Sequence, residues 1–262
     1  MSASVHGAIT AKTVKKGSLV KQILGAALRR HAGMTALLAG LVCAPMAMAQ
    51  SAAPSGSVNL EGTWKLASPQ TALVPTDAAK PPFTKDGLAQ YEQNKKDAAK
   101  RDLSFDQTAS TCSAPGLPRL MLVPGRFRLI QRERVVTMAF EWNRLFRQID
   151  MRDVPQKRPE VDSMNGASFG QWSGDTLVVK SLGFLPDKLL DNLVSGSDTL
   201  ELVEHIRLKD RNTLEDRITI TDRTNFTRPW ETVLTYKRQQ DEPFLEDNCL
   251  DRKKAGKPAL PR

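Results

Sequence analysis

The stretch LELVEHIRLKDRNTLEDRITITD, residues 200–222, decides the fold class of this chain. Apolar and polar side chains alternate on both sides of its centre, and the polar residues 209–212 separate the two alternating runs. Alternation interrupted by a short polar link is typical of two half-buried β-strands joined as a hairpin. We therefore predict strands at 200–208 and 213–222.

The same alternation recurs on both sides of this hairpin. Six more strands are predicted, at Val58–Leu66, Arg126–Arg132, Val135–Trp142, Arg144–Met151, Thr176–Leu182 and Trp230–Arg238. The links are mostly short and contain no helical crossovers, which favours an antiparallel meander. Eight strands suffice to close a small barrel around one ligand. The prediction is an all-β barrel with one or two peripheral helices, and a twisted β-sandwich is the alternative.

One segment outside the strands has the signals of a helix. Residues 84–102 begin with Thr84, a favourable N-cap, and hold few large apolar side chains, so the helix should lie on the surface. Residues 103–124 contain three prolines and are expected to be irregular.

The first 49 residues have the features of a secretory signal peptide. Six basic and no acidic residues precede the apolar run Met34–Val42, and residues 47–49, AMA, form a small-x-small cleavage site. Pro45 interrupts the apolar run well before the roughly 20 residues that a membrane span requires. We therefore expect cleavage before Gln50, no membrane span, and a periplasmic or secreted bacterial protein.

The rest of the chain is expected to form one domain. Residues 50–57 are small and polar, which predicts a linker; the domain covers 58–250, and 251–262 is expected to be a disordered basic tail. The leader holds six of the 38 basic residues and none of the 29 acidic ones, so the exported chain carries a net charge of only +3. That balance argues against a nucleic-acid partner.

Two cysteines, Cys112 and Cys249, remain after the leader is removed. Two such thiols usually form a disulfide in an oxidising compartment, and we predict this bond; unpaired thiols, buried or reactive, are the alternatives. His205 is then the only histidine, too few for a typical zinc site, and no Gly-rich phosphate loop is present. We expect no metal and no cofactor.

Alternation also indicates which polar side chains share the apolar faces of the strands. Arg147, Glu204 and Asp216 each lie in an otherwise aliphatic row, on three different strands. Isolated charges in an apolar interior must pair or shift their pKa values. Two interpretations stay open: a structural ion pair, or a pocket in which Arg147 binds negative charge and one acid is a general base.

Five further residues are predicted to line the same interior. Gln131 contributes an amide, Glu141 a carboxylate, and Trp64, Trp230 and Tyr236 aromatic surface. Large aromatic side chains beside a few polar groups suit a small hydrophobic or aromatic ligand, although core packing explains them equally well.

A serine hydrolase is a further hypothesis. Residues 166–170, GASFG, fit the pattern G-x-S-x-G, and Ser168, Asp191 and His205 follow the chain order of an α/β-hydrolase triad. That pattern needs a strand–turn–helix context, whereas a strand follows here. His205 is also expected to point away from the apolar face.

Several motifs resemble known families. Residues 60–66, LEGTWKL, resemble the G-x-W opening strand of lipocalin-like proteins. Residues 140–144, FEWNR, 170–179, GQWSGDTLVV, and 227–230, TRPW, together resemble a family of exported, largely uncharacterised bacterial proteins, over nearly the whole exported length. The resemblance implies export and these domain boundaries, and it transfers no catalytic residue.

These observations predict an exported barrel that binds a small hydrophobic or aromatic molecule. The leading hypothesis is a cofactor-independent lyase or isomerase, with Glu204 or Asp216 as base and Arg147 stabilising developing negative charge. The alternatives are a non-catalytic periplasmic binding or carrier protein, a serine hydrolase using Ser168, and an envelope interaction protein whose interior is filled by its own side chains. The oligomeric state stays open.

Overall fold

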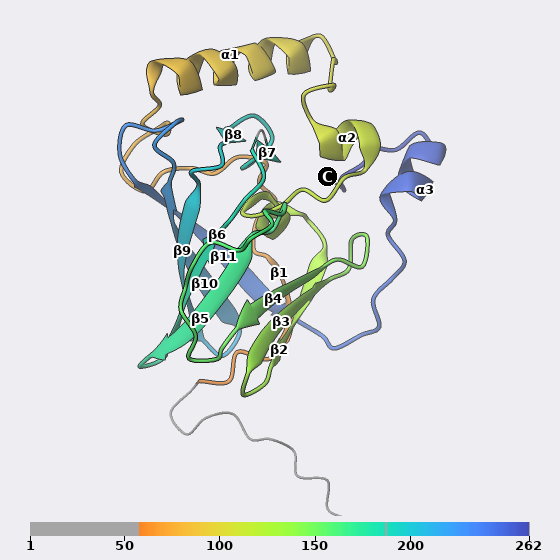
Figure 1. Ribbon diagram of the computed structural model, residues 1–262. Coiled ribbons are helices and arrows are strands. Elements are labelled where there is room, and N and C mark those ends of the chain that lie inside the picture. The colour runs from red at the N-terminus through yellow and green to blue at the C-terminus, as the bar shows by residue number, and fades with distance from the viewer. Residues whose placement is uncertain (1–57, 187, 262) are drawn as a thin grey trace, which may run out of the picture. The chain divides into compact units, whose positions relative to one another are not determined.

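Nine strands close into a barrel in the computed structural model, which describes residues 58–186 and 188–261 (Figure 1). The strands are β1 (Gly62–Leu66), β2 (Arg126–Gln131), β3 (Val135–Phe140), β4 (Phe146–Asp150), β5 (Ala167–Ser173), β6 (Thr176–Leu182), β9 (Glu201–Asp210), β10 (Thr213–Thr221) and β11 (Trp230–Gln239). Their order around the barrel is β1-β11-β10-β9-β6-β5-β4-β3-β2. The predicted all-β barrel is thus confirmed.

One pair of neighbours departs from the expected antiparallel meander. β4 and β5 run parallel, whereas every other pair of barrel neighbours is antiparallel. The prediction missed β5 because its inward positions carry Ser168 and Gly170 rather than large apolar side chains. Gly170 is small for a packing reason, since a Cβ there would lie 2.7 Å from Cγ2 of Ile149.

Shorter elements lie outside the barrel. They are the helices α1 (Lys85–Ala99), α2 (Gln107–Thr111) and α3 (Cys249–Lys254), the 3-10 helix η1 (Arg119–Leu122), and the paired strands β7 (Lys188–Leu189) and β8 (Ser195–Gly196). Figure 1 shows α1 across one end of the barrel, next to β7 and β8. None of the helices in the described part of the chain is long and apolar enough to cross a membrane.

Side-chain caps fix where these helices begin. Oγ1 of Thr84 accepts a hydrogen bond from the backbone N–H of Gly87 at 3.0 Å, so α1 starts where the sequence predicted. Residues 103–124 are less irregular than expected, because they contain α2 and η1. Asp106 caps α2 by accepting from the N–H of Ala109 at 3.0 Å.

The G-x-W segment of β1 packs against the last barrel strand. The Trp64 ring is fully buried, and the guanidinium carbon of Arg238 lies 4.2 Å from the ring centroid. Nη1 of Arg238 also donates to the carbonyl oxygen of Glu61 at 2.7 Å. Gly62 has a φ of +144°, a backbone conformation that favours glycine.

The C-terminal segment packs against the domain rather than forming the expected disordered tail. Residues 249–254 form α3, and the indole N–H of Trp142 donates to the carbonyl oxygen of Ala259 at 3.0 Å. The predicted disulfide between Cys112 and Cys249 is confirmed, and it joins the end of α2 to the start of α3. The predicted signal peptide, 1–49, and linker, 50–57, lie outside the described residues.

The disulfide should contribute strongly to stability, because its cysteines are 137 residues apart in the chain. A double Cys112→Ala, Cys249→Ala variant is expected to lose about 5 kcal/mol of unfolding free energy, the loop-entropy value for a loop of this size. Urea denaturation of the variant and of the oxidised protein measures the loss. An unchanged midpoint would show that the bond does not constrain the unfolded chain.

Candidate functional site

Arg147, Glu204 and Asp216 meet inside the barrel, and each is only 1% exposed. Arg147 projects inward from β4 and forms a two-pronged ion pair with Glu204 of β9. Its Nη1 donates to Oε1 at 2.8 Å, and its Nη2 donates to Oε2. Burial opposes the charge on Arg147, but the adjacent Glu204 outweighs burial and raises the pKa of the guanidinium. The two parallel contacts have the geometry of a bidentate, charge-assisted pair.

Two serines extend this ion pair along the barrel wall. Nη2 of Arg147 donates to Oγ of Ser181 at 3.3 Å and lies 3.5 Å from Oγ of Ser168. The two hydroxyl groups are hydrogen-bonded to each other at 2.8 Å. A continuous polar network therefore runs through four neighbouring strands: β4, β5, β6 and β9.

Asp216 is the second acid beside a single arginine. It lies on β10 opposite Ile206, one inward position along β9 from Glu204. Burial, followed by the negative charge of Glu204, raises its pKa well above the ordinary value of 3.8. Neither of its carboxylate oxygens accepts a hydrogen bond from any described residue, whereas a protonated Asp216 can donate to Glu204. We therefore infer that burial favours the neutral form of Asp216 in the folded protein.

The predicted aromatic and amide residues are also buried in the domain. Tyr236 donates its hydroxyl proton to the carbonyl oxygen of Met121 at 3.1 Å, and burial raises its pKa well above the ordinary value. Oε1 of Gln131 accepts from the N–H of Leu60 at 3.1 Å. Trp64 and Trp230 are at most 1% exposed, so these side chains pack the core.

Glu141 does not join this group. It follows β3, whose inward positions are Val136, Met138 and Phe140, so the opposite row of this strand faces outward. Its Oε1 accepts from Nη2 of Arg126 at 2.6 Å.

The structure does not assemble the residues of the hydrolase hypothesis. Ser168 points inward, whereas His205 is exposed on the outer face of β9. Asp191 accepts backbone hydrogen bonds from Leu73, Leu193 and Val194 in a different part of the fold. No imidazole of the described residues therefore reaches the Ser168 hydroxyl.

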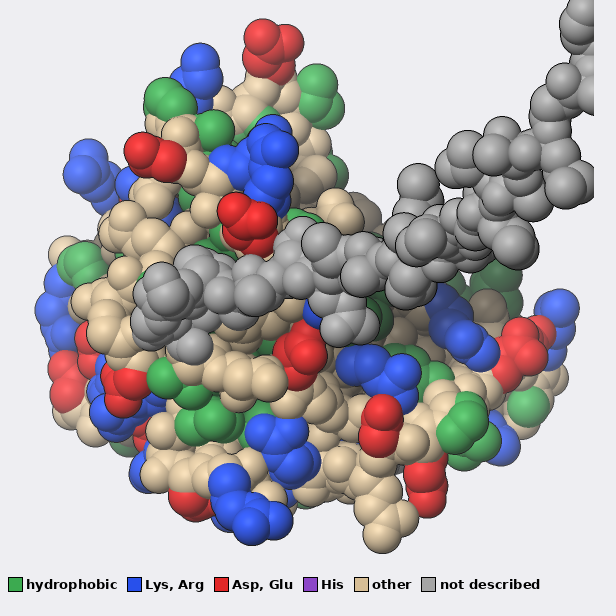
Figure 2. Space-filling view, turned by 90° about the horizontal axis from the view of Figure 1, so that it is seen from below, with side chains coloured by type: hydrophobic (Ala, Val, Ile, Leu, Met, Phe, Trp, Pro, Cys, Tyr) green, Lys and Arg blue, Asp and Glu red, His purple; other side chains and the backbone are tan. Residues whose placement is uncertain are grey.

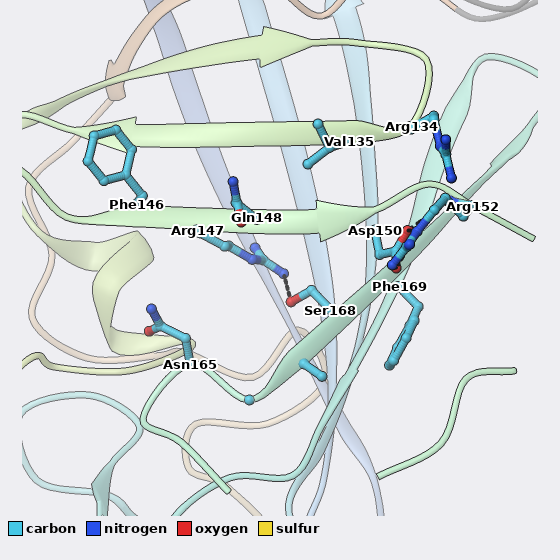
Figure 3. Close-up of a pocket in the computed structure, with 12 residues that line it drawn as sticks. Arg134, Val135, Phe146, Arg147, Gln148, Asp150, Arg152, Asn165, Ser168 and Phe169 are labelled. Atoms are coloured by element: carbon cyan, nitrogen blue, oxygen red, sulfur yellow. Dashed lines mark hydrogen bonds and ion pairs between the residues drawn. The ribbon is translucent and has the colours of Figure 1, made fainter. Parts of the chain in front are cut away.

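A cleft opens where the barrel is least completely closed. β4 and β5 share two residue pairs, Ile149 with Ser168 and Asp150 with Phe169. Next to them lies a cleft of about 720 Å³, lined by Arg134, Val135, Phe146, Arg147, Gln148, Asp150, Arg152, Asn165, Gly166, Ala167, Ser168 and Phe169. Figure 3 shows Arg147 and Ser168 pointing toward each other across the gap between the two strands. The inner network and the cleft therefore share two residues.

Sequence reasoning missed most of the cleft because it missed β5. One signal was available in the sequence: Phe146 shares the outer row of β4 with Gln148 and Asp150. In the structure its side chain is 63% exposed. A large apolar residue in a polar row marks a surface that a ligand can cover.

The described residues offer no competing metal site, and the face shown in Figure 2 offers no competing charged site. On the face shown in Figure 2, basic and acidic side chains are interspersed, so that face has no large patch of one charge. The residues that the structure describes contain no group of three or more His, Cys, Asp or Glu side chains placed to hold a metal ion.

No family model, curated protein or solved structure matches the chain. The family resemblance therefore stays a prediction.

The two buried acids should respond differently to neutralisation. Glu204→Gln leaves Arg147 without a counterion and is expected to cost about 3 kcal/mol or more of unfolding free energy. Asp216→Asn replaces a neutral acid and should cost far less at pH 7. The exposed pair Arg228–Asp77 supplies the control, since Asp77→Asn is expected to change stability by less than about 1 kcal/mol. Urea denaturation measures all three, and equal losses at Glu204 and Asp216 would contradict the assignment.

Asp216 should also make stability depend on pH. Its pKa is raised in the folded state, so above the ordinary value of 3.8 the native protein holds a proton that the unfolded chain has released. Stability should therefore fall as pH rises from 3.8 toward the raised pKa. Asp216→Asn removes this loss. As pH rises, the unfolding free energy of the variant should therefore increase relative to that of the wild type. Urea denaturation at several values between about pH 4 and about pH 9 measures the unfolding free energy of both proteins. If the two free energies change with pH by the same amount, the raised pKa is refuted.

Proposed function

We propose that this protein is exported and binds a small hydrophobic or aromatic molecule in the cleft between β4 and β5. The observation that carries the proposal is the incomplete seam between these strands, which gives a cleft access to Arg147 and Ser168 of the interior. A cleft that combines aromatic walls with a few polar groups is typical of small-molecule sites.

The walls of the cleft supply apolar contact. Phe146 and Phe169 line it, and the exposed side chain of Phe146 gives up contact with water when a ligand covers it. Burying most of a phenylalanine side chain contributes about 1–2 kcal/mol. This contribution favours a flat or aromatic ligand over a fully polar one.

The rim of the cleft supplies positive charge. Arg152 is paired with Asp150, its Nη2 lying 2.6 Å from Oδ2. Arg134 lines the same cleft, and no described acidic side chain forms an ion pair with it. A ligand with an acidic or hydrogen-bond-accepting group can therefore bind Arg134.

Binding without chemistry agrees better with this geometry than the lyase or isomerase hypothesis does. Glu204 and Asp216 do not line the cleft, and Glu204 is held by both terminal nitrogens of Arg147. A general base must lie within hydrogen-bond reach of the proton it removes. The non-catalytic binding or carrier protein is therefore the function we favour, and turnover of the bound compound is the second candidate.

Methyl-labelled methionines can report ligand binding at this site. The sulfur atoms of Met121 and Met138 each lie 3.9 Å from Nη1 of Arg147, so a ligand that reaches Arg147 should shift both methyl signals. Phenylacetate is a suitable first probe, because it has one ring and one acidic group. Analysis of the recovered phenylacetate decides between the candidates: unchanged compound supports binding, and conversion that requires Asp216 supports catalysis.

Phe146→Ala should weaken phenylacetate binding by about tenfold, which corresponds to the loss of most of one aromatic contact. Leu245→Ala is the matched control, because Leu245 is 73% exposed and does not line the cleft. Titration calorimetry measures both affinities. Equal affinities for Phe146→Ala and wild type would place the ligand elsewhere and refute the proposed site.

A further inference from the structure

A second cavity lies outside the barrel, beside α2 and β7. Its volume is about 180 Å³, and its walls are mainly apolar, with Phe105, Met164 and Leu185 among them. An apolar cavity of about 150 Å³ is large enough for benzene. The second cavity therefore suits a molecule with a single ring or a short alkyl chain.

Lys188 lines this cavity and carries a buried amine. The residue is 3% exposed, its Nζ donates to the carbonyl oxygen of Leu117 and lies 3.4 Å from that of Met164, and the ring centroid of Phe184 is 3.8 Å away. No acidic side chain of the described residues forms an ion pair with Lys188. Burial lowers the pKa of Lys188 well below its ordinary value, and the more distant charge of Asp222 opposes this only in part. A counterion would remove the main cost of charging the amine.

Arg119 lines the same cavity. Its two terminal nitrogens bind the Asp106 carboxylate at 2.7 and 2.6 Å, and Nη2 also donates to Asn192 at 3.1 Å. The Nε–H group is buried and has no acceptor among the described residues. An unsatisfied buried N–H group costs free energy, so an acceptor brought by a ligand would stabilise it.

We propose that this second cavity binds a small apolar carboxylic acid, with its carboxylate beside Lys188 and Arg119 and its hydrocarbon part against the apolar wall. The positive charge of Arg119 is already balanced by Asp106, so the charge of the ligand is matched by Lys188. The residues that make this site differ from those of the β4–β5 cleft, and the proposal does not depend on that cleft.

Hexanoate and 1-hexanol test the role of charge, since they share the alkyl chain and differ in the carboxylate. Hexanoate should bind at least tenfold more tightly than 1-hexanol to the full chain, as measured by calorimetry. Lys188→Met should remove this difference, whereas Lys254→Met should keep it, because Lys254 has an 80% exposed side chain and does not line the cavity. Equal binding of the acid and the alcohol by the wild type would overturn the proposal.

Proton uptake gives a second readout. A carboxylate beside Lys188 raises the pKa of its amine, so hexanoate binding should draw a proton from the buffer. Calorimetry at one pH in two buffers with different ionisation enthalpies detects this proton. Uptake that persists in Lys188→Met would mean that the proton does not go to Lys188.

The position of the ligand can be checked without changing Lys188. Hexanoate should shift the methyl signal of Met164 and leave those of Met121 and Met138 unchanged. Leu185→Trp should fill the cavity and weaken hexanoate binding at least tenfold, and Leu250→Trp, at an exposed position on α3, should not. Undiminished binding to Leu185→Trp, or shifts confined to Met121 and Met138, would overturn the proposal even if Lys188→Met does not fold.

Discussion

The ion pair between Arg147 and Glu204 is the interaction on which the closure of this barrel depends. β4 and β5 share two residue pairs, so backbone hydrogen bonds alone hold this seam weakly. The side chain of Arg147 passes across the seam to Ser168, Ser181 and Glu204, and it thereby joins β4 to three further strands. Both charges are buried, and removing either one would leave the other without compensation in an apolar interior. The seam is therefore held by side chains where backbone pairing is short.

The same arrangement explains why two acids can share an interior with one arginine. Arg147 neutralises Glu204 through two hydrogen bonds, which leaves no full counterion for Asp216. Protonation is the less costly state for Asp216, because a neutral carboxyl group can donate to Glu204 and carries no charge into the core. A raised pKa is often a sign of catalysis, but structural charge networks produce it as well. Asp216 does not line the cleft, whereas its neighbour Arg147 does, and this favours the structural explanation.

The alternation of inward and outward side chains along the strands was enough to predict most of the residues of the interior. Arg147, Glu204 and Asp216 could be assigned inward because each interrupts an aliphatic row, and the pairing of Cys112 with Cys249 followed from their number and from the predicted export. Alternation did not reveal β5, because the inward row of this strand holds Ser168 and Gly170 instead of large apolar side chains. Side chains of neighbouring strands fill the space beside Gly170. Without β5, neither the parallel seam nor its cleft could be predicted. Glu141 was placed inward because parity along a single strand does not say which of its two rows faces the core.

One short segment relates the two cavities to each other. Met164 lines the second cavity, and its neighbour Asn165 lines the β4–β5 cleft. The segment is closely packed, since Gly166 has a φ of +62° and a Cβ there would lie 2.7 Å from the carbonyl oxygen of Leu182. Substitutions in this segment would therefore disturb both cavities at once and could not assign a ligand to either. Phe146 and Lys188 each line one cavity and lie outside the segment, so a substitution at either residue changes only one of the two proposed binding sites.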